Sequence, residues 1–189
     1  AAEGAAVAVN YNGSRDKAEA VVAEIEKAGG KAKAYKADVA NFDEVKAMVA
    51  NIVADFGGLN IVVNNAGVAL RNRFVDTTPD EWKKQIDICL YGAIHVSKAA
   101  APHLEKAGDG RIIALVGDSS RVGESGLAIV AAARSGVIAA RSCVGECQPR
   151  QADEALPAPQ ARFSFRYRAD GDVAGIPERW MDHRSDDQH

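Results

Sequence analysis

The residue types that usually carry enzyme chemistry are sparse in this chain of 189 residues. The histidines lie at four scattered positions, His95, His103, His183 and His189. No Ser–His–Asp or Cys–His arrangement is evident among them, and a packed or exposed imidazole is the favoured interpretation of each. Cys143 and Cys147 lie one helical turn apart, but no further ligands lie nearby, so the sequence predicts no metal site.

Polar side chains that could exchange a proton gather in "GDSSRVGES", residues 117–125. Asp118 is a candidate base, and Ser119 and Ser120 are candidate hydrogen-bond donors to a substrate oxygen. The alternative, which the pattern favours, is a polar loop that leads into a helix and has no catalytic role.

Short apolar segments alternate with helical segments over the first three-quarters of the chain. The predicted strands cover 5–11, 31–39, 59–67 and 110–117. The predicted helices include one that Asn41 or Asp43 can cap, a long one over 79–106 that opens on a capping box, and one over 126–147. The alternation predicts an α/β fold with a doubly wound, parallel, Rossmann-like sheet.

In such a sheet the carboxyl ends of the strands lie along one edge, and ligands bind there. The residues at these ends are Asn10, Asp38, Asn64 and Gly117. The sequence therefore places its candidate site at this edge, beside the 117–125 stretch.

Composition bounds the class of protein. Hydrophobic residues make up 47% and charged residues 26%, which is typical of a globular domain. The net charge of −3 predicts no attraction to nucleic acid or to an anionic membrane. No apolar run approaches the roughly 18 residues that span a bilayer. The three cysteines are too few for a disulfide framework, so a reducing, cytoplasmic compartment is expected.

The character of the chain changes near residue 147. The segment 148–189 holds four of the six prolines and no lysine, and it lacks a hydrophobic period. We therefore expect a partial nucleotide-binding domain over 1–147 and a poorly ordered tail over 148–189. Within the tail, "RFSFRYR" alternates, and it is either an edge strand or unstructured.

Several motifs occur in one order at one spacing: "DV" at 38–39, "NNAG" at 64–67, the long helix "PDEWKKQIDICLYGAIHVSKAA", and "GRII" followed by "AAARSGVIA". Over residues 1–147 the chain resembles the short-chain dehydrogenase/reductase family. The resemblance implies a Rossmann-type oxidoreductase that uses a nicotinamide cofactor on a small alcohol or carbonyl compound. Together with the alternating pattern, the family's strand order implies that strand 31–37 pairs with 5–10, and that strand 59–63 pairs with 110–116. The family's glycine-rich phosphate loop and the strand before it, which lies centrally in the sheet, are not in this sequence, so the sheet is expected to be incomplete, with a gap or a new pairing.

The resemblance also implies where the cofactor lies. Asp38 matches the residue that contacts adenine, with the Val39 backbone beside it, and a capped turn is the alternative for Asp38. The loop "NNAG" lines the cofactor ribose. The implied cofactor-binding residues are Asn10, Ser14, Arg15, Asp38, Val39, Asn65, Ala66, Gly67 and Arg134.

The type of cofactor is read at the end of the first strand, in "NYNGSR". A carboxylate at this place would repel a 2′-phosphate, and none is present. Ser14 and Arg15 can bind a phosphate, which favours NADP over NAD. The alternative is that Arg15 is simply a solvated residue of the first helical turn.

The family's four catalytic positions carry other residues here. The tyrosine, lysine, serine and asparagine positions match Val130, Arg134, Gly117 and Cys89. The chain is therefore expected to be impaired in hydride transfer, with Asp118, Ser119 or Ser120 as possible substitutes. The alternatives are a non-catalytic nucleotide-binding or interaction module, in which helices 79–106 and 126–147 join subunits of a homo-oligomer, and a truncated or frame-shifted gene product. The substrate is not identifiable from the sequence.

Overall fold

The structure, a computed structural model, describes residues 1–140 and 162–167. Its strands are β1 (Val7–Tyr11), β2 (Ala32–Lys36), β3 (Ile61–Asn64), β4 (Arg111–Val116) and β5 (Arg162–Tyr167). Its α-helices are α1 (Arg15–Lys27), α2 (Phe42–Phe56), α3 (Pro79–Ile86), α4 (Gly92–Ala107), α5 (Ser119–Val122) and α6 (Ala128–Ala140). A 3₁₀ turn, η1 (Phe74–Asp76), and a π turn, η2 (Asp87–Tyr91), complete the described elements.

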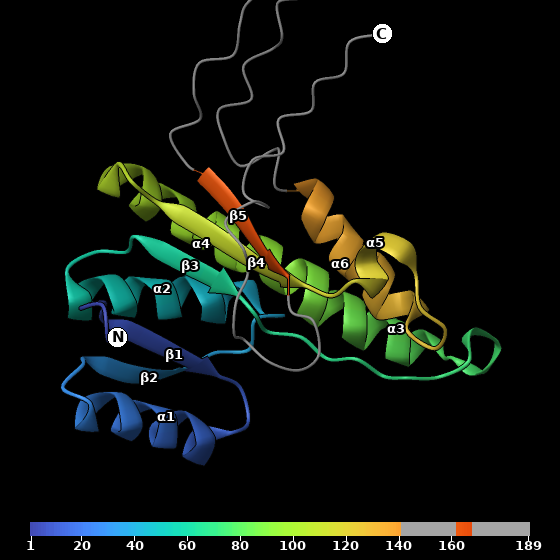
Figure 1. The fold of residues 1–189 in the computed structure, drawn as a ribbon, viewed down its shortest axis with the longest axis horizontal. Coiled ribbons are helices and arrows are strands. Elements are labelled where there is room, and N and C mark those ends of the chain that lie inside the picture. The colour runs from blue at the N-terminus through green and yellow to red at the C-terminus, as the bar shows by residue number, and fades with distance from the viewer. Residues whose placement is uncertain (141–161, 168–189) are drawn as a thin grey trace, which may run out of the picture.

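The strands pair in parallel, and the predicted pairings are confirmed. β1 pairs with β2, and β3 pairs with β4. The described strands form two sheets, one with the order β1-β2 and one with the order β3-β4-β5. The arrows of β1, β3 and β4 point the same way in Figure 1. Of the two expected outcomes for the incomplete sheet, the structure therefore shows the gap, which lies between β1 and β3.

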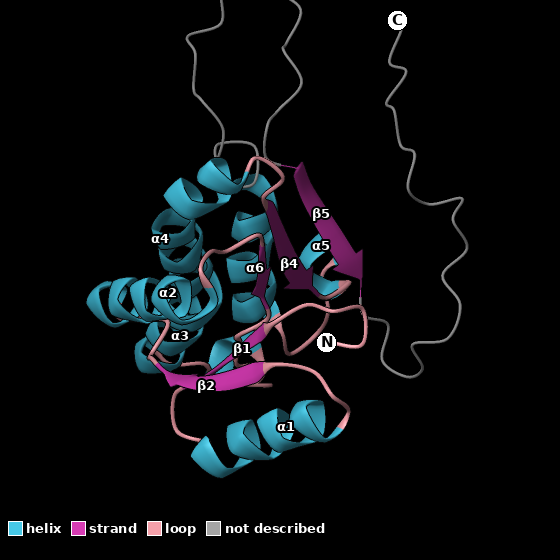
Figure 2. Ribbon diagram, turned by 90° about the vertical axis from the view of Figure 1, so that its left-hand side faces the viewer, coloured by secondary structure: helices cyan, strands magenta, loops and turns pink. Residues whose placement is uncertain are grey.

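Helices cover the strands and join the two sheets. Figure 2 shows α2 and α4 together on one side of the strands. α1 packs against β1 and β2, and α6 packs against β4. One core cluster centres on α2, with Val45 fully buried, and a second joins Val62 of β3 to Ala100 and Leu104 of α4. Val96 of α4 packs against both clusters, so this helix connects the sheets through their apolar faces.

The long helix predicted over 79–106 is helical throughout, but it is not uniform. Thr78 and Glu81 form the predicted capping box at its start. The π turn η2 then separates α3 from α4. Gly92 follows this turn, and a Cβ atom there would lie 2.8 Å from Cγ2 of Val39. The glycine therefore lets the helix approach the loop after β2 closely.

The remaining predictions of elements have mixed outcomes. Asn41, one of two candidate caps, is the N-cap of α2, and its side chain accepts hydrogen bonds from the N–H groups of Asp43 and Glu44. The segment 162–167 is a strand at the edge of the sheet, paired in parallel with β4. The helix predicted over 126–147 is α6, and residues 141–147 lie outside the described residues, as does most of the predicted tail. The division at residue 147 stays a prediction. No helix within the described ranges is long and apolar enough to cross a membrane.

Candidate functional site

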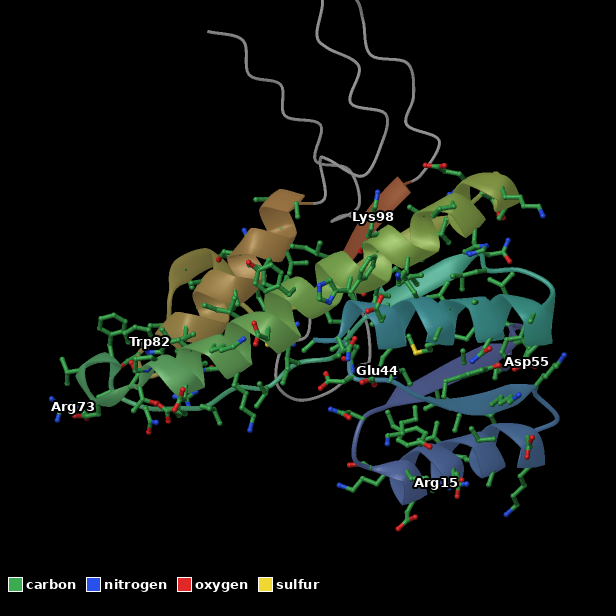
Figure 3. All side chains as sticks on the ribbon, turned by 180° about the vertical axis from the view of Figure 1, so that it is seen from behind. Arg15, Glu44, Asp55, Arg73, Trp82 and Lys98 are labelled. Carbon is green, nitrogen blue, oxygen red and sulfur yellow. The ribbon has the colours of Figure 1, made fainter. Side chains whose placement is uncertain are left out.

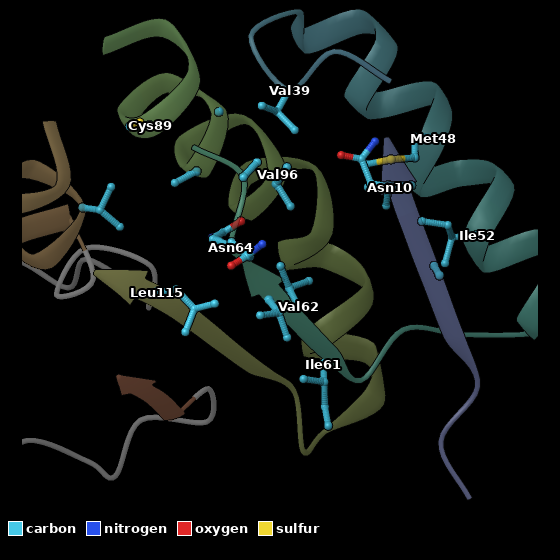
Figure 4. A pocket seen from close by; sticks show the side chains of 18 of the residues that line it. Asn10, Val39, Met48, Ile52, Ile61, Val62, Asn64, Cys89, Val96 and Leu115 are labelled. Carbon is cyan, nitrogen blue, oxygen red and sulfur yellow. The ribbon is translucent and has the colours of Figure 1, made fainter. Parts of the chain in front are cut away.

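A cavity of about 300 Å³ lies at the gap between the two sheets, below the carboxyl ends of β3 and β4. Figure 4 shows Asn10 and Met48 on one side of it, and Asn64, Val62 and Leu115 on the other. The cavity brings together seven of the residues singled out from the sequence. They are Asn10, Val39, Asn64, Asn65, Ala66, Cys89 and Arg134. Ser14, Arg15, Asp38 and Gly67 are not among its lining residues.

Cys89 anchors the loop that follows β3. It lies in the π turn η2, and its side chain is 2% exposed. Its Sγ accepts a hydrogen bond from the N–H of Val68 and donates one to the carbonyl of Val68, both at 3.4 Å. The thiol at the family's asparagine position therefore holds the backbone of the loop in place.

Val130 and Arg134 lie on α6 beside Cys89. Val130 packs with Cys89 and Ala133 in a small apolar cluster and is 6% exposed. The guanidinium of Arg134 donates a hydrogen bond to the carbonyl of Leu115 and contacts Gly67. A Cβ atom at residue 67 would collide with this guanidinium, so a larger residue there would require the long Arg134 side chain to move. Among the described residues that line the cavity, Arg134 is the only charged one.

Gly117 follows β4 directly, two residues beyond the carbonyl that Arg134 binds. Thus three of the four positions matched to the catalytic residues lie together, and they carry a thiol, a buried valine and an arginine. The fourth, Gly117, has no side chain. A valine and a glycine cannot donate or accept a proton, and an arginine does not release its proton in proteins. The arrangement offers a cation and backbone groups, but no acid–base pair at these positions.

The three possible substitutes lie beside Gly117. Ser119 is the nearest, since its Oγ would lie 3.5 Å from a Cβ atom at residue 117. Asp118 is exposed and is the N-cap residue of the short helix α5. Ser120 is buried, and its Oγ has no hydrogen-bond partner within the described part of the chain. Ser135 of α6 donates to the carbonyl of Ser120, so α5 is fastened to α6. No group of three or more His, Cys, Asp or Glu side chains in the described ranges could hold a metal ion.

Of the residues expected near a 2′-phosphate, Asn10 bonds to the backbone and Arg15 pairs with a neighbouring carboxylate. The Asn10 amide donates to the carbonyls of Ala37, at 3.0 Å, and Tyr35, and so ties the ends of β1 and β2 together. Arg15 forms an ion pair with Glu19 at 2.7 Å, and this neighbour raises the pKa of the guanidinium. Ser14 is the N-cap residue of α1, but its side chain makes no capping hydrogen bond.

Asp38 caps a turn with its own side chain, which was the alternative to adenine contact in the sequence analysis. Its Oδ1 accepts a hydrogen bond from the N–H of Ala40 at 2.9 Å. Val39 is buried, and its carbonyl lies 2.9 Å from Nδ1 of His95 on α4. The loop after β2 is therefore held in shape by its own carboxylate and by α4.

Sequence reasoning missed Gln85, which is 1% exposed. Its Oε1 accepts from the N–H of Leu70 and its Nε2 donates to the carbonyl of Glu81. Gln85 and Cys89 lie four residues apart on one helical face, so both hold the loop after β3. The sequence did contain a signal for this role, because Gln85 is a polar residue one helical turn before Cys89.

A parallel α/β sheet with its cavity at the carboxyl strand ends is the arrangement of a Rossmann-type nucleotide-binding domain. The family model described as enoyl-(acyl carrier protein) reductase matches residues 1–151. The chain belongs to the short-chain dehydrogenase/reductase family, a class of oxidoreductases.

Known proteins support this membership over most of the chain. The 3-oxoacyl-[acyl-carrier-protein] reductase FabG of Staphylococcus aureus (strain N315) is 43% identical over 138 residues, which are 73% of this chain and 56% of the relative. A short chain dehydrogenase from Mycobacterium avium is 33% identical with a TM-score of 0.71, covering 77% of this chain and 55% of that one. A gluconate 5-dehydrogenase from Burkholderia cenocepacia J2315, in complex with NADP and tartrate, is 30% identical with a TM-score of 0.66, covering 71% and 52%. The chain spans about half the length of the curated relatives it matches.

Proposed function

We propose that this chain binds NADP(H) at the carboxyl ends of its strands and does not, by itself, transfer hydride at a rate typical of its family. The observation that carries the proposal is the set of residues at the catalytic positions, where Val130, on the helix that carries Arg134, packs against Cys89, and Gly117 follows β4 without a side chain. Losing a proton-transfer group costs about 10²–10⁴ in rate, and losing the donor to the substrate oxygen costs about 10²–10³ more, although such losses are not additive.

The residues present fit a nicotinamide dinucleotide at the loop after β3. Asn65 and Ala66 line the cavity, and Gly67 has no side chain to obstruct it. Arg134 would hold the ribose hydroxyls through its N–H groups. When bound, the nicotinamide supplies the hydride. The similarity to a gluconate 5-dehydrogenase in complex with NADP supports NADP as the cofactor.

The experiment separates binding from turnover. The purified chain is titrated with NADPH and with NADH, and cofactor fluorescence is followed. The loss of NADPH is then measured with small ketones and acyl thioesters. We expect saturable NADPH binding and no turnover above background.

The matched variants are Val130→Tyr alone and the set Cys89→Asn, Gly117→Ser, Val130→Tyr, Arg134→Lys. The single variant should stay inactive, because the site would still lack the serine that donates to the substrate oxygen and the lysine that positions the cofactor. Clear turnover by the unchanged chain would contradict the proposal, and it would point to Asp118, Ser119 or Ser120. Absence of any cofactor binding would contradict its first half.

Self-association through α4 is part of the same proposal. Tyr91 and Ile94 are 50% and 41% exposed on adjoining turns of η2 and α4, and Trp82 of α3 is 36% exposed. Exposed aromatic and branched side chains are enriched at interfaces between subunits. A Tyr91→Ser, Ile94→Ser variant should shift sedimentation toward a monomer, and an unchanged sedimentation coefficient would argue against this face.

A further inference from the structure

The loop between β1 and α1 contains Asn12–Gly13, the only place in the sequence where a glycine follows an asparagine. Both residues are exposed, and the loop begins at the carboxyl end of β1 (Figure 1). The carbonyls of Tyr11 and Ser14, on either side of the pair, each accept a backbone hydrogen bond. Within the described part of the chain, neither the Asn12 side chain nor the Gly13 N–H forms one. The side-chain amide can therefore approach the next peptide nitrogen.

This pair of residues can react in water without an enzyme. The backbone nitrogen of Gly13 loses its proton and attacks Cγ of Asn12, which closes a five-membered succinimide ring and releases the side-chain nitrogen as ammonia. Water then opens the ring and leaves aspartate or isoaspartate at position 12. Glycine permits the attack because it has no Cβ beside the nitrogen, and even a Cβ atom at residue 13 would meet nothing within 4 Å.

We propose that Asn12 is a deamidation site, and that its conversion to a carboxylate lowers the preference of the chain for NADP(H) over NAD(H). The inference rests on the proposed function, because it concerns the same cofactor site. The stretch "NYNGSR" carries no carboxylate, and this feature favours a cofactor with a 2′-phosphate. Deamidation places a negative charge in this stretch, two residues before Ser14 and three before Arg15. The charge repels a phosphate that these two residues would bind.

The fold should tolerate the modification. The Asn12 side chain has no hydrogen bond within the described ranges that its conversion would break. It lies two residues before Ser14, the N-cap residue of α1, and a negative charge near the N-terminus of a helix is favourable. A change in cofactor preference after deamidation would therefore come from the new charge and not from unfolding.

The first measurement detects the modification itself and uses no cofactor. The purified chain is incubated at mildly alkaline pH, which favours loss of the proton from the attacking nitrogen, and the tryptic peptide 1–15 is followed by mass spectrometry. Fragment ions should assign the change from amide to acid to Asn12. Asn72 is the internal control, because it is also exposed but its amide donates to Glu81, and a bulky residue follows it. It should stay unmodified over the same time.

Two variants connect the modification to cofactor choice. Gly13→Ala obstructs ring closure, and it should fold normally because Gly13 is not among the glycines with a positive φ and its Cβ position is open. Asn12→Asp carries the product charge from the start. It should bind NADPH at least about tenfold more weakly than the unchanged chain and NADH by clearly less, and high salt should reduce the difference. Incubation should move the unchanged chain, but not Gly13→Ala, toward the affinities of Asn12→Asp.

Three outcomes would overturn the proposal. One is deamidation of Asn12 that is no faster than that of Asn72. Another is an equal loss of NADPH and NADH affinity in Asn12→Asp, or a loss that salt does not reduce, because the charge would then not face a 2′-phosphate. The third is the absence of NADPH binding by the fresh, unchanged chain, which would overturn the proposed function and the effect on cofactor choice together. The mass measurement distinguishes this last case, since it reports the modification whether or not a cofactor binds.

Discussion

Arg15 lies on the outer side of α1, where Figure 3 shows it far from the β3–β4 sheet. Its guanidinium is held by Glu19. If Arg15 contacts a 2′-phosphate, Arg15→Ala should weaken NADPH binding by about tenfold, the value of one charge-assisted hydrogen bond, and NADH binding by less. Glu19→Gln releases the guanidinium and should strengthen NADPH binding. Both affinities are measured by fluorescence titration.

Lys17→Ala is the matched control, since it removes a cation from the same helix without the predicted phosphate contact. Equal losses for NADPH and NADH on Arg15→Ala would show that the 2′-phosphate is not bound there. The exposed Arg15–Glu19 pair itself contributes little to stability, so the unfolding midpoint should barely change.

Asp55 gives a pH-dependent stability. Its Oδ2 accepts hydrogen bonds from Lys33 at 2.7 Å and from the Tyr35 hydroxyl at 2.8 Å, and these, Lys33 first, lower the pKa of the carboxyl. Because the folded pKa lies below the unfolded value of about 3.9, this stabilisation is present above that pH and is lost as the pH falls through the folded pKa. The urea midpoints of the chain and of Asp55→Asn should differ near neutral pH and converge in acid.

Tyr35→Phe is the control for this prediction, because it keeps the Lys33 pair and should show a smaller acid dependence. On the alkaline side, burial and the neighbouring carboxylate raise the pKa of Tyr35. Stability from the neutral hydroxyl is therefore complete below about pH 10 and declines as the pH rises further. A difference between the chain and Asp55→Asn that persists unchanged in acid would contradict the prediction.

For single residues, the sequence indicated which positions make up the candidate site, but not the hydrogen bonds that hold them. Strand ends and motif spacing correctly brought Cys89, Val130 and Arg134 to one place. The hydrogen bonds of Cys89 with Val68, and of Gln85 with Leu70, could not be predicted. They depend on how close a loop lies to a helix, and this distance has no periodic signal in the sequence.

At the scale of elements, the two N-cap positions offer a matched comparison. Asn41 accepts two backbone hydrogen bonds at the start of α2, while Ser14 makes none at the start of α1. Asn41→Ala should lower the free energy of unfolding by about 1 kcal/mol, and Ser14→Ala should lower it by clearly less. Urea unfolding followed by circular dichroism measures both, and equal losses would contradict the assigned caps.

Helix boundaries were mostly predictable, because capping residues and glycines mark them. Thr78 with Glu81 fixed the start of α3, and Gly57, with φ 80°, ends α2. The π turn η2 was not predictable. It adds a residue to one turn while the apolar pattern continues, and it is compatible with the close approach of Gly92 to Val39.

At the scale of the whole molecule, α4 joins two sheets that do not pair. Val96 packs against both core clusters, whereas Val53 of α2 packs against the first alone. Val96→Ala should cost about 1–3 kcal/mol and reduce hydrogen-exchange protection in both sheets. Val53→Ala should reduce it in β1–β2 with little change in β3–β4. If Val96→Ala affected one sheet only, α4 would not be the connection.

The fold class followed from the alternation of apolar and helical segments, and both strand pairings followed from this alternation together with the family's strand order. The sequence did not show whether "RFSFRYR" forms a strand, because its alternation is too short to distinguish an edge strand from a loop. Its pairing with β4 was therefore not predicted. The gap between β1 and β3 was one of two expected outcomes. Choosing between them required knowing that the α2–α4 layer keeps the sheets in place without a strand between them.

The bonds between the Cys89 thiol and Val68 have a kinetic consequence. A thiol reagent reaches Sγ only while the loop after β3 is lifted, because the side chain is 2% exposed when the loop is closed. The alkylation rate therefore counts loop openings, in the same way that amide exchange reports local unfolding. Peptide mass mapping separates this thiol from Cys143 and Cys147. Anything that occupies the adjoining cavity will be recorded as a longer labelling half-life, whether or not it undergoes a reaction.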